Sequence, residues 1–275
     1  MPTWAAAILT AAIVAALWLA WAFAARRLMS GPRRDPHDLL DAAILTFLKV
    51  YLRAVHRVTY EGLDHLRAIE SAIAEGRPVI VIANHTAGTD PLLVQNATWA
   101  FEIRWMMASD MRIKLLEPFW TWARIIDVER FAGDPTSARV ALRHLATGGT
   151  IGIFPEGGIE RPAEHLLPFL PGVGLLIKRS AALVLPALID GTPRVDPAFA
   201  ALWNPSRSRV RFGEPIDYAA AGLKPAAIVE DLQNRYADWS GWPLNTNRTD
   251  GVGQRPTAPA GNNADSTETA VTVPA

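Results

Sequence analysis

Cysteine is absent from the 275 residues, and several sequence signatures of common functions are absent as well. Without a thiol, the chain can form no disulfide, no thiolate nucleophile and no cysteine-ligated zinc or iron–sulfur site. The formal net charge is zero, so the composition gives no indication of nucleic-acid binding. The chain also lacks a Gly-x-Ser-x-Gly nucleophile elbow and a Walker A motif. These absences exclude the cysteine, serine-elbow and P-loop classes of active site.

Charge is also missing from Ala5 to Ala25, a run of 21 residues that are nearly all Ala, Leu, Ile, Val, Trp or Phe. As a helix this run would be about 31 Å long, which matches the hydrocarbon core of a bilayer. No Lys or Arg precedes it, whereas four arginines follow it within ten residues. Residues 1–28 are therefore predicted to be a membrane anchor that leaves the rest of the chain in the cytoplasm. The alternative is a cleaved signal peptide, because Ala22-Phe23-Ala24 resembles a cleavage site.

Residues 29–59 are predicted to form an amphipathic basic helical segment. Apolar residues recur at helical spacing from Leu39 to Leu52, and residues 26–57 carry seven Lys or Arg against three Asp. One interpretation places this helix on an anionic leaflet, where each basic residue contributes about 1 kcal/mol. The other packs it on the folded domain with a solvated basic face. The sequence leaves both open.

Tryptophan is abundant, with ten residues, and four of them lie close together in mid-chain: Trp99, Trp105, Trp120 and Trp122. Packing in a core would explain this cluster. The alternative is an amphipathic belt near lipid headgroups, because indole rings favour that interface.

Short apolar runs alternate with helical stretches through residues 60–242, which are predicted to be one folded domain. Strands are predicted at residues 78–83, 103–109, 125–129, 152–155, 183–189 and 209–212, and helices at 91–100, 135–146 and 173–182. This alternation predicts an α/β fold with a mixed, largely parallel sheet flanked by helices. Residues 243–275 are rich in Thr, Asn, Ala, Gly and Pro, and we expect them to be disordered.

The first motif with chemical content follows the strand predicted at residues 78–83, in the run Asn84-His85-Thr86-Ala87-Gly88-Thr89-Asp90. Asp90 is expected to be the N-cap of the next helix, with Pro91 at its first position. His85 then lies in a loop at the carboxyl end of a strand, where open α/β sheets bind their ligands. Gly88 is expected to let this loop turn back, so that the side chains of His85 and Asp90 meet.

The chemistry expected from this pair is general base catalysis. A carboxylate that accepts a hydrogen bond from one imidazole nitrogen fixes the tautomer of the ring and stabilises the imidazolium. The other nitrogen is then free to take a proton from a substrate hydroxyl. Taken alone, the spacing also fits an ordinary helix cap beside a histidine in a turn.

A second motif, Gly152-Ile153-Phe154-Pro155-Glu156-Gly157-Gly158, also ends a predicted strand. Glu156 is expected to bind acceptor hydroxyls, and the backbone near Gly157 to offer N–H groups to a developing oxyanion. The alternative is a turn with an exposed glutamate. Since both motifs lie at the same edge of a parallel sheet, the two together favour an active site.

Asn-His-x4-Asp, followed about 65 residues later by Phe-Pro-Glu-Gly, resembles the glycerolipid acyltransferases typified by lysophosphatidate acyltransferase. Further blocks are similar to that family over about residues 61–216: Ile126-Asp127-Val128-Glu129-Arg130, Pro171-Gly172 and Val184-Leu185-Pro186-Ala187. The resemblance implies that His85 is the general base and Asp90 its orienting partner, with Arg130 as a phosphate ligand. The implied substrate-binding residues are Asn84, Arg130, Phe154, Pro155, Glu156, Gly157, Gly158 and Arg161.

The resemblance also implies that residues 60–242 are an acyltransferase domain, and it implies the substrates. An acyl thioester, either acyl-CoA or acyl carrier protein, would donate its acyl group to a lysolipid hydroxyl, and no metal or redox cofactor is implied. The expected acceptor is 1-acylglycerol-3-phosphate, which would give phosphatidic acid at the cytoplasmic side of the cell membrane.

Two positions depart from the family pattern. Ile159 stands where the third block usually has an Arg that can grip a phosphate, and Arg161 is the residue that would compensate. Arg124 stands where the second block usually has Gly. The first departure favours an alternative acceptor, such as another lysolipid or a hydroxylated or amine compound. A non-catalytic, membrane-tethered lipid-binding protein is the third hypothesis, which the intact His85, Asp90 and Glu156 disfavour.

Overall fold

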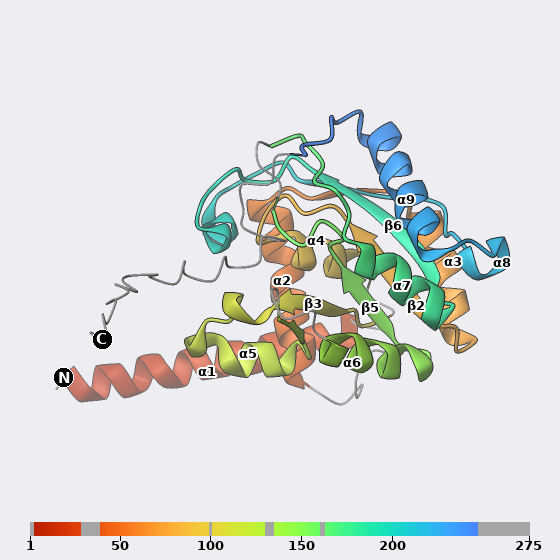
Figure 1. Cartoon of the computed structure of the whole chain (residues 1–275). Helices are drawn as coiled ribbons and strands as arrows, with labels where there is room; N and C mark the ends of the chain where they lie inside the picture. Colours follow the sequence, from red (N-terminus) through yellow and green to blue (C-terminus); the bar gives the residue numbers. More distant parts are fainter. Residues whose placement is uncertain (1–2, 29–38, 99–100, 130–134, 160–162, 247–275) are drawn as a thin grey trace, which may run out of the picture.

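The computed structural model of the chain describes residues 3–28, 39–98, 101–129, 135–159 and 163–246. Within these residues, strands form a single seven-stranded sheet with helices on both faces (Figure 1). The strands are β1 (Thr59–Glu61), β2 (Val79–Ala83), β3 (Arg104–Ala108), β4 (Ile126–Val128), β5 (Thr150–Ile153), β6 (Leu183–Asp190) and β7 (Arg209–Phe212). The α-helices are α1 (Thr3–Leu28), α2 (Leu39–Val55), α3 (Leu63–Ala74), α4 (Asp90–Ala97), α5 (Glu117–Trp122), α6 (Pro135–Ala146), α7 (Pro171–Ser180), α8 (Tyr218–Ala221) and α9 (Pro225–Ser240). Short 3-10 turns are η1 (Ser109–Met111), η2 (Lys114–Leu116) and η3 (Ala198–Trp203).

The strand order is β1-β7-β6-β2-β5-β3-β4, and every neighbouring pair is parallel except β6 and β7. The antiparallel pair has Ala187 opposite Phe212. It arises because the chain returns from β6 to β7 through a connection that carries only the short turn η3, without a crossover helix. The predicted fold class, a mixed and largely parallel sheet flanked by helices, is confirmed.

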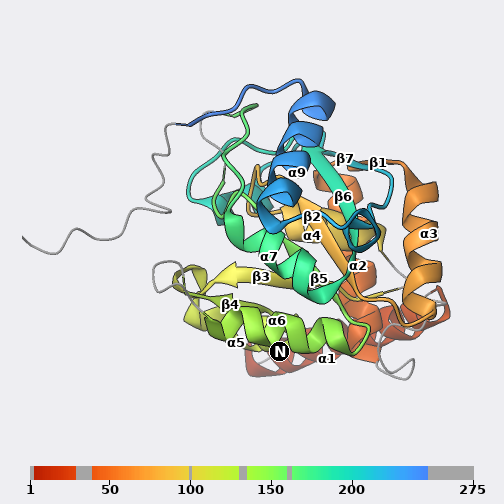
Figure 2. The same ribbon diagram turned by 45° about the vertical axis from the view of Figure 1, so that its right-hand side comes forward.

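The central strand β2 is buried on both faces, which explains its unbroken apolar sequence. Val79, Val81 and Ala83 lie in a core shared with α2, α3 and α4. Ile80 and Ile82 lie in a second core shared with α6, α7 and α9 on the opposite face (Figure 2). The sheet therefore separates two apolar layers. The loops that follow the parallel strands leave from the carboxyl ends of those strands, at one edge of the sheet.

Tyr236 of α9 connects the second layer to the sheet. Its hydroxyl donates to the carbonyl of Ile82, at 2.6 Å, and accepts from the amide of Ala187, at 3.0 Å. Burial raises the pKa of this tyrosine above its usual value, so the hydroxyl remains a donor. These bonds join β2 and β6 close to the ends from which the candidate site emerges.

The two N-terminal helices differ in how they contact the domain. The residues Trp4–Ala24 of α1 form a helix long and apolar enough to cross a membrane, and nearly all of it is exposed. Near its C-terminal end, Trp21 donates its indole N–H to the carbonyl of Ala43 in α2, at 3.2 Å. α2 itself packs on the domain and buries Leu52 completely in the first core. α2 therefore makes the packing contact of the second alternative, and residues 29–38 of the basic segment lie outside the described residues.

Two glycines on α7 provide a matched test of helix packing. A Cβ at Gly174 would lie 2.1 Å from the carbonyl oxygen of Pro225 in α9, whereas a Cβ at Gly172 would meet nothing within 4 Å. We expect Gly174→Ala to lower the free energy of unfolding by about 1–3 kcal/mol through overpacking. Gly172→Ala is expected to be neutral or slightly stabilising. Urea denaturation of both variants in detergent would check this, and equal stability of the two would contradict it.

Candidate active site

His85 and Asp90 lie at the two ends of the loop that joins β2 to α4, and their side chains meet. The distance from His85 Nδ1 to Asp90 Oδ2 is 2.9 Å, and the Asp90 side chain is fully buried while that of His85 is 19% exposed. A carboxylate can only accept, so Nδ1 carries the proton in this bond. The basic nitrogen is then Nε2, which is the one suited to a substrate hydroxyl.

Asp90 also organises the loop that carries His85. Its carboxylate accepts from the backbone N–H of Thr86, at 2.6 Å, and of Ala87, at 2.9 Å, and from the Thr86 hydroxyl, at 3.1 Å. The prediction that Asp90 caps α4 is wrong, because Thr89 is the N-cap and Asp90 is the first helical residue. The carboxylate turns away from the helix and folds the loop around itself, which fixes the position of the imidazole.

Gly88 is required for a different reason from the one predicted. Its φ does not fall in the left-handed region, so the turn itself does not demand glycine. A Cβ there would lie 2.5 Å from the carbonyl oxygen of Ala198 at the start of η3. Glycine is needed because the backbone of η3 approaches the His85–Asp90 loop closely.

The imidazole of His85 is held between its hydrogen bond and an aromatic stack. Phe154 stacks on His85 with ring centroids 4.1 Å apart and planes inclined by 14°. Trp105 of β3 stacks on the far side of Phe154 at 4.8 Å and 15°. The indole lies over Gly152, where a Cβ would come within 2.5 Å of it. The second motif therefore contributes the surface that sets the plane of the imidazole.

Two polar side chains of the motifs are directed to the backbone. Glu156 is fully buried, and its two oxygens accept from the N–H of His85, at 2.8 Å, and of Leu167, at 2.7 Å. Asn84 pairs with both backbone groups of Ile189 in β6, at 2.9 and 2.7 Å. These contacts do not support the predicted exposure of Glu156 to acceptor hydroxyls, or direct binding of substrate by Asn84. They make both residues positioning groups that tie the His85 loop to its neighbours.

The remaining residues of the second motif shape its turn. Pro155 is buried and its carbonyl accepts from Leu170, at 2.8 Å. Gly157 has a positive φ of 68°, and its N–H donates to the carbonyl of Phe154, at 3.1 Å. Gly158 is buried behind it. The N–H of Gly157 is thus used within the turn, so its predicted role at an oxyanion is not supported by this contact.

The two predicted arginine ligands, Arg130 and Arg161, lie outside the residues that the structure describes. Arg124 is described, and its φ of 51° lies in the left-handed region. This backbone conformation explains why a glycine is usual at that position of the family block. The guanidinium pairs with Glu102, at 3.2 Å.

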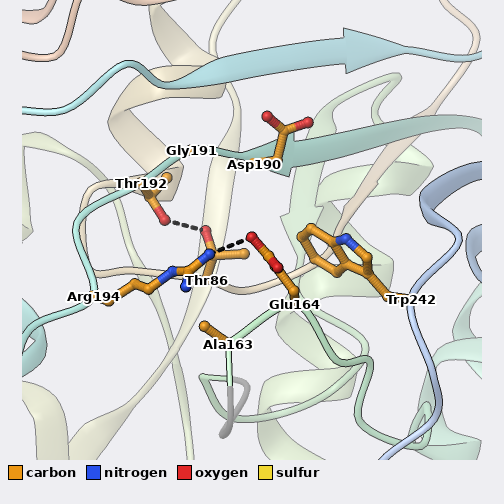
Figure 3. Close-up of a pocket in the computed structure, with 8 residues that line it drawn as sticks. All are labelled: Thr86, Ala163, Glu164, Asp190, Gly191, Thr192, Arg194 and Trp242. Atoms are coloured by element: carbon orange, nitrogen blue, oxygen red, sulfur yellow. Dashed lines mark hydrogen bonds and ion pairs between the residues drawn. The ribbon is translucent and has the colours of Figure 1, made fainter.

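A small pocket opens beside the His85–Asp90 loop and is lined by Thr86, Ala163, Glu164, Asp190, Gly191, Thr192, Arg194 and Trp242 (Figure 3). Thr192 donates its hydroxyl to Thr86 Oγ1, at 2.8 Å, and Thr86 donates in turn to Asp90. Arg194 and Glu164 form an ion pair across the pocket (Figure 3). Sequence reasoning missed these residues. The available signal was that Thr192 follows β6, which runs parallel to β2 and ends at the same sheet edge.

Residues 57–190 match the family model described as Acyltransferase. This segment contains β1 to β6, both motifs and the His85–Asp90 pair, so the family match covers the residues that the two motifs bring together. The chain is also similar to the crystal structure of the 1-acyl-sn-glycerophosphate (LPA) acyltransferase PlsC from Thermotoga maritima, with 18% identity and a TM-score of 0.58 over 83% of this chain and 91% of that one. No curated protein matches the sequence. The predicted resemblance to the glycerolipid acyltransferase family is confirmed.

Proposed function

We propose that the protein is a lysophospholipid O-acyltransferase of the His-x4-Asp type, which acts in phospholipid biosynthesis. It transfers a fatty acyl group from acyl-CoA or acyl carrier protein to 1-acylglycerol-3-phosphate, giving phosphatidic acid. The observation that carries this proposal is the partly exposed imidazole of His85, oriented by the buried Asp90 at 2.9 Å within an acyltransferase-family domain.

The proposed reaction begins with Nε2 of His85 taking the proton of the lysolipid hydroxyl. The oxygen attacks the thioester carbonyl carbon, and the negative charge of Asp90 stabilises the imidazolium that forms. The carbon–sulfur bond then breaks, and the leaving thiolate receives the proton from the imidazolium. The products are an ester and a free thiol, and no protein nucleophile takes part.

The proposed location is the cytoplasmic side of the cell membrane, with α1 as the anchor. Arginines follow the apolar run and none precedes it, which supports an outward N-terminus. An acyltransferase tethered in this way would meet an acceptor that resides in the same bilayer.

A second candidate keeps the chemistry and changes the acceptor to a lysolipid without a terminal phosphate. It is favoured by Ile159 and by the pocket beside Thr86, where the cation Arg194 is already paired with Glu164. Binding of a phosphate monoester would require a cationic side chain that is not already paired with a carboxylate. The described lining of this pocket contains no such side chain.

The test is transfer of a labelled acyl group by membranes that carry the wild type, His85→Ala or the control His144→Ala. His144 lies on α6, away from the catalytic loop. We expect activity towards lysophosphatidate in the wild type and the control, and its loss in His85→Ala. Equal activity of all three would contradict the proposal, and turnover restricted to acceptors without phosphate would select the second candidate.

A further inference from the structure

Large apolar side chains are exposed on the folded domain as well as on α1. Leu115 of η2 is 86% exposed and Trp203 of η3 is 76% exposed, with Ile113 and Leu116 beside Leu115. On α2, Phe47 and Val50 are each about half exposed. We name these six residues the η2–η3 surface. A cluster of this kind on a folded domain indicates an interaction site.

The η2–η3 surface is held together by contacts between elements far apart in the sequence. Trp120 of α5 donates its indole N–H to the carbonyl of Ile113, at 3.2 Å, and its ring lies 6.0 Å from that of Phe199 in η3. Tyr51 of α2 stacks on Phe47 and donates its hydroxyl to the carbonyl of Leu202 in η3. The exposed side chains therefore sit on three elements that support one another.

This surface is continuous with the candidate membrane span. α2, which carries Phe47 and Val50, is the helix that receives Trp21 of α1. Figure 1 shows α1 passing α5 and projecting beyond the rest of the domain. In both views α5 and the teal turn η3 lie toward the left of the molecule, and in Figure 1 α8 lies at the opposite, right-hand end (Figures 1 and 2).

The turn η3, which carries Trp203, also lies against the loop that holds His85. The carbonyl oxygen of Ala198, the first residue of η3, lies 2.5 Å from the position that a Cβ of Gly88 would occupy. Gly88 is between His85 and Asp90. Whatever the η2–η3 surface binds is therefore held next to the candidate catalytic centre.

We propose that the η2–η3 surface inserts into the interfacial layer of the bilayer in which α1 is anchored, with Leu115 and Trp203 as the inserted side chains. The chemistry fits, because leucine and tryptophan are typical of surfaces that lie at the boundary between headgroups and acyl chains. A spanning helix alone places the domain beside the bilayer, whereas a second contact brings the loop that holds His85 toward the lipid. The inference rests on the proposed membrane anchoring by α1, and its test reads position in the bilayer rather than turnover.

The absence of cysteine makes the experiment direct. Leu115→Cys, Trp203→Cys and the control Ala221→Cys on α8 each carry one nitroxide label, and the full chain is reconstituted in phosphatidylcholine–phosphatidylglycerol vesicles. Collision rates with oxygen and with a water-soluble nickel chelate then report the depth of each label. We expect labels at 115 and 203 to be at least about threefold more protected from nickel than the label at 221, with greater access to oxygen.

Equal nickel access at all three sites would overturn the proposal. Protection at 115 and 203 accompanied by spin–spin broadening, and without increased oxygen access, would identify a second copy of the chain as the occupant and would also overturn it. If insertion is observed but no acyl transfer is found, the proposed function fails and the membrane contact remains. Insertion observed together with turnover lost in His85→Ala would support both.

Discussion

Asp90→Asn is expected to reduce kcat for acyl transfer by about 10³-fold or more while leaving the fold nearly intact. The reason lies in how the two carboxylate oxygens are used. Oδ2 accepts three N–H bonds, from His85, Thr86 and Ala87, whereas Oδ1 meets only the Thr86 hydroxyl among the bonds described. An asparagine can keep its oxygen on the three donors and direct its NH2 to that hydroxyl, which rotates to accept. The substitution therefore removes the charge and retains the geometry.

Loss of charge matters because the imidazolium formed in the reaction loses its counterion. The stability cost should be modest, at about 1 kcal/mol, since the three N–H donors keep their acceptor and only the bond with the Thr86 hydroxyl is reversed. Steady-state kinetics with a saturating acceptor, together with thermal unfolding, would separate the two effects. The control is Asp64→Asn on α3, an exposed residue paired with Arg67. A kcat for Asp90→Asn within threefold of the wild type would rule out Asp90 as the partner of a general base.

The parts of the site that the sequence predicted are those that depend on one strand and its following loop. The apolar run of β2 predicts a buried strand, and the polar residues after it must then lie at the sheet edge. Because β5 is parallel to β2, the Phe154–Glu156 motif reaches the same edge, and the two motifs meet as expected. This part needs only the direction of the strands.

The other parts depend on which loop lies beside which, and the sequence does not contain that order in any local pattern. The need for glycine at position 88 comes from Ala198, which is more than a hundred residues away in the sequence. The side chain of Asn84 bonds to Ile189, which is close only because β6 lies next to β2 in the sheet. Asp90 was expected to cap α4 because the local sequence permits a cap. Three competing donors in the loop attract its carboxylate instead.

Helices α3 and α9 were likewise not predicted, although both have an apolar stripe. Their buried residues are spaced at three or four positions: Leu66, Ile69 and Ala72 in α3, and Ile228, Leu232 and Tyr236 in α9. That spacing was available in the sequence. The role of Tyr236 was not, because its hydroxyl bonds only to the backbones of β2 and β6.

Glu156→Gln distinguishes the role predicted from the sequence from the role that the structure supports. Both oxygens of Glu156 accept from backbone N–H groups, those of His85 and Leu167, and neither donor can rotate or reverse its role. The NH2 of a glutamine must therefore face one of them. We expect a loss of about 1–3 kcal/mol in the free energy of unfolding, because a buried donor is left without an acceptor. We also expect kcat to fall by at least about tenfold, since the displaced group is the backbone of His85.

The control is Glu164→Gln, in which an exposed glutamate loses the charge that pairs with Arg194. Its effect on stability should stay within about 0.5 kcal/mol. Thermal unfolding and the separate measurement of kcat and KM for the acceptor would decide between the roles. If Glu156 bound acceptor hydroxyls, the glutamine variant would raise KM and leave the unfolding temperature unchanged. Loss of stability and kcat together, with KM little altered, is the outcome required of a buried carboxylate that holds the catalytic loop in place. The contrast with Asp90→Asn then follows from one structural difference, which is whether a rotatable hydroxyl is present to accommodate the amide.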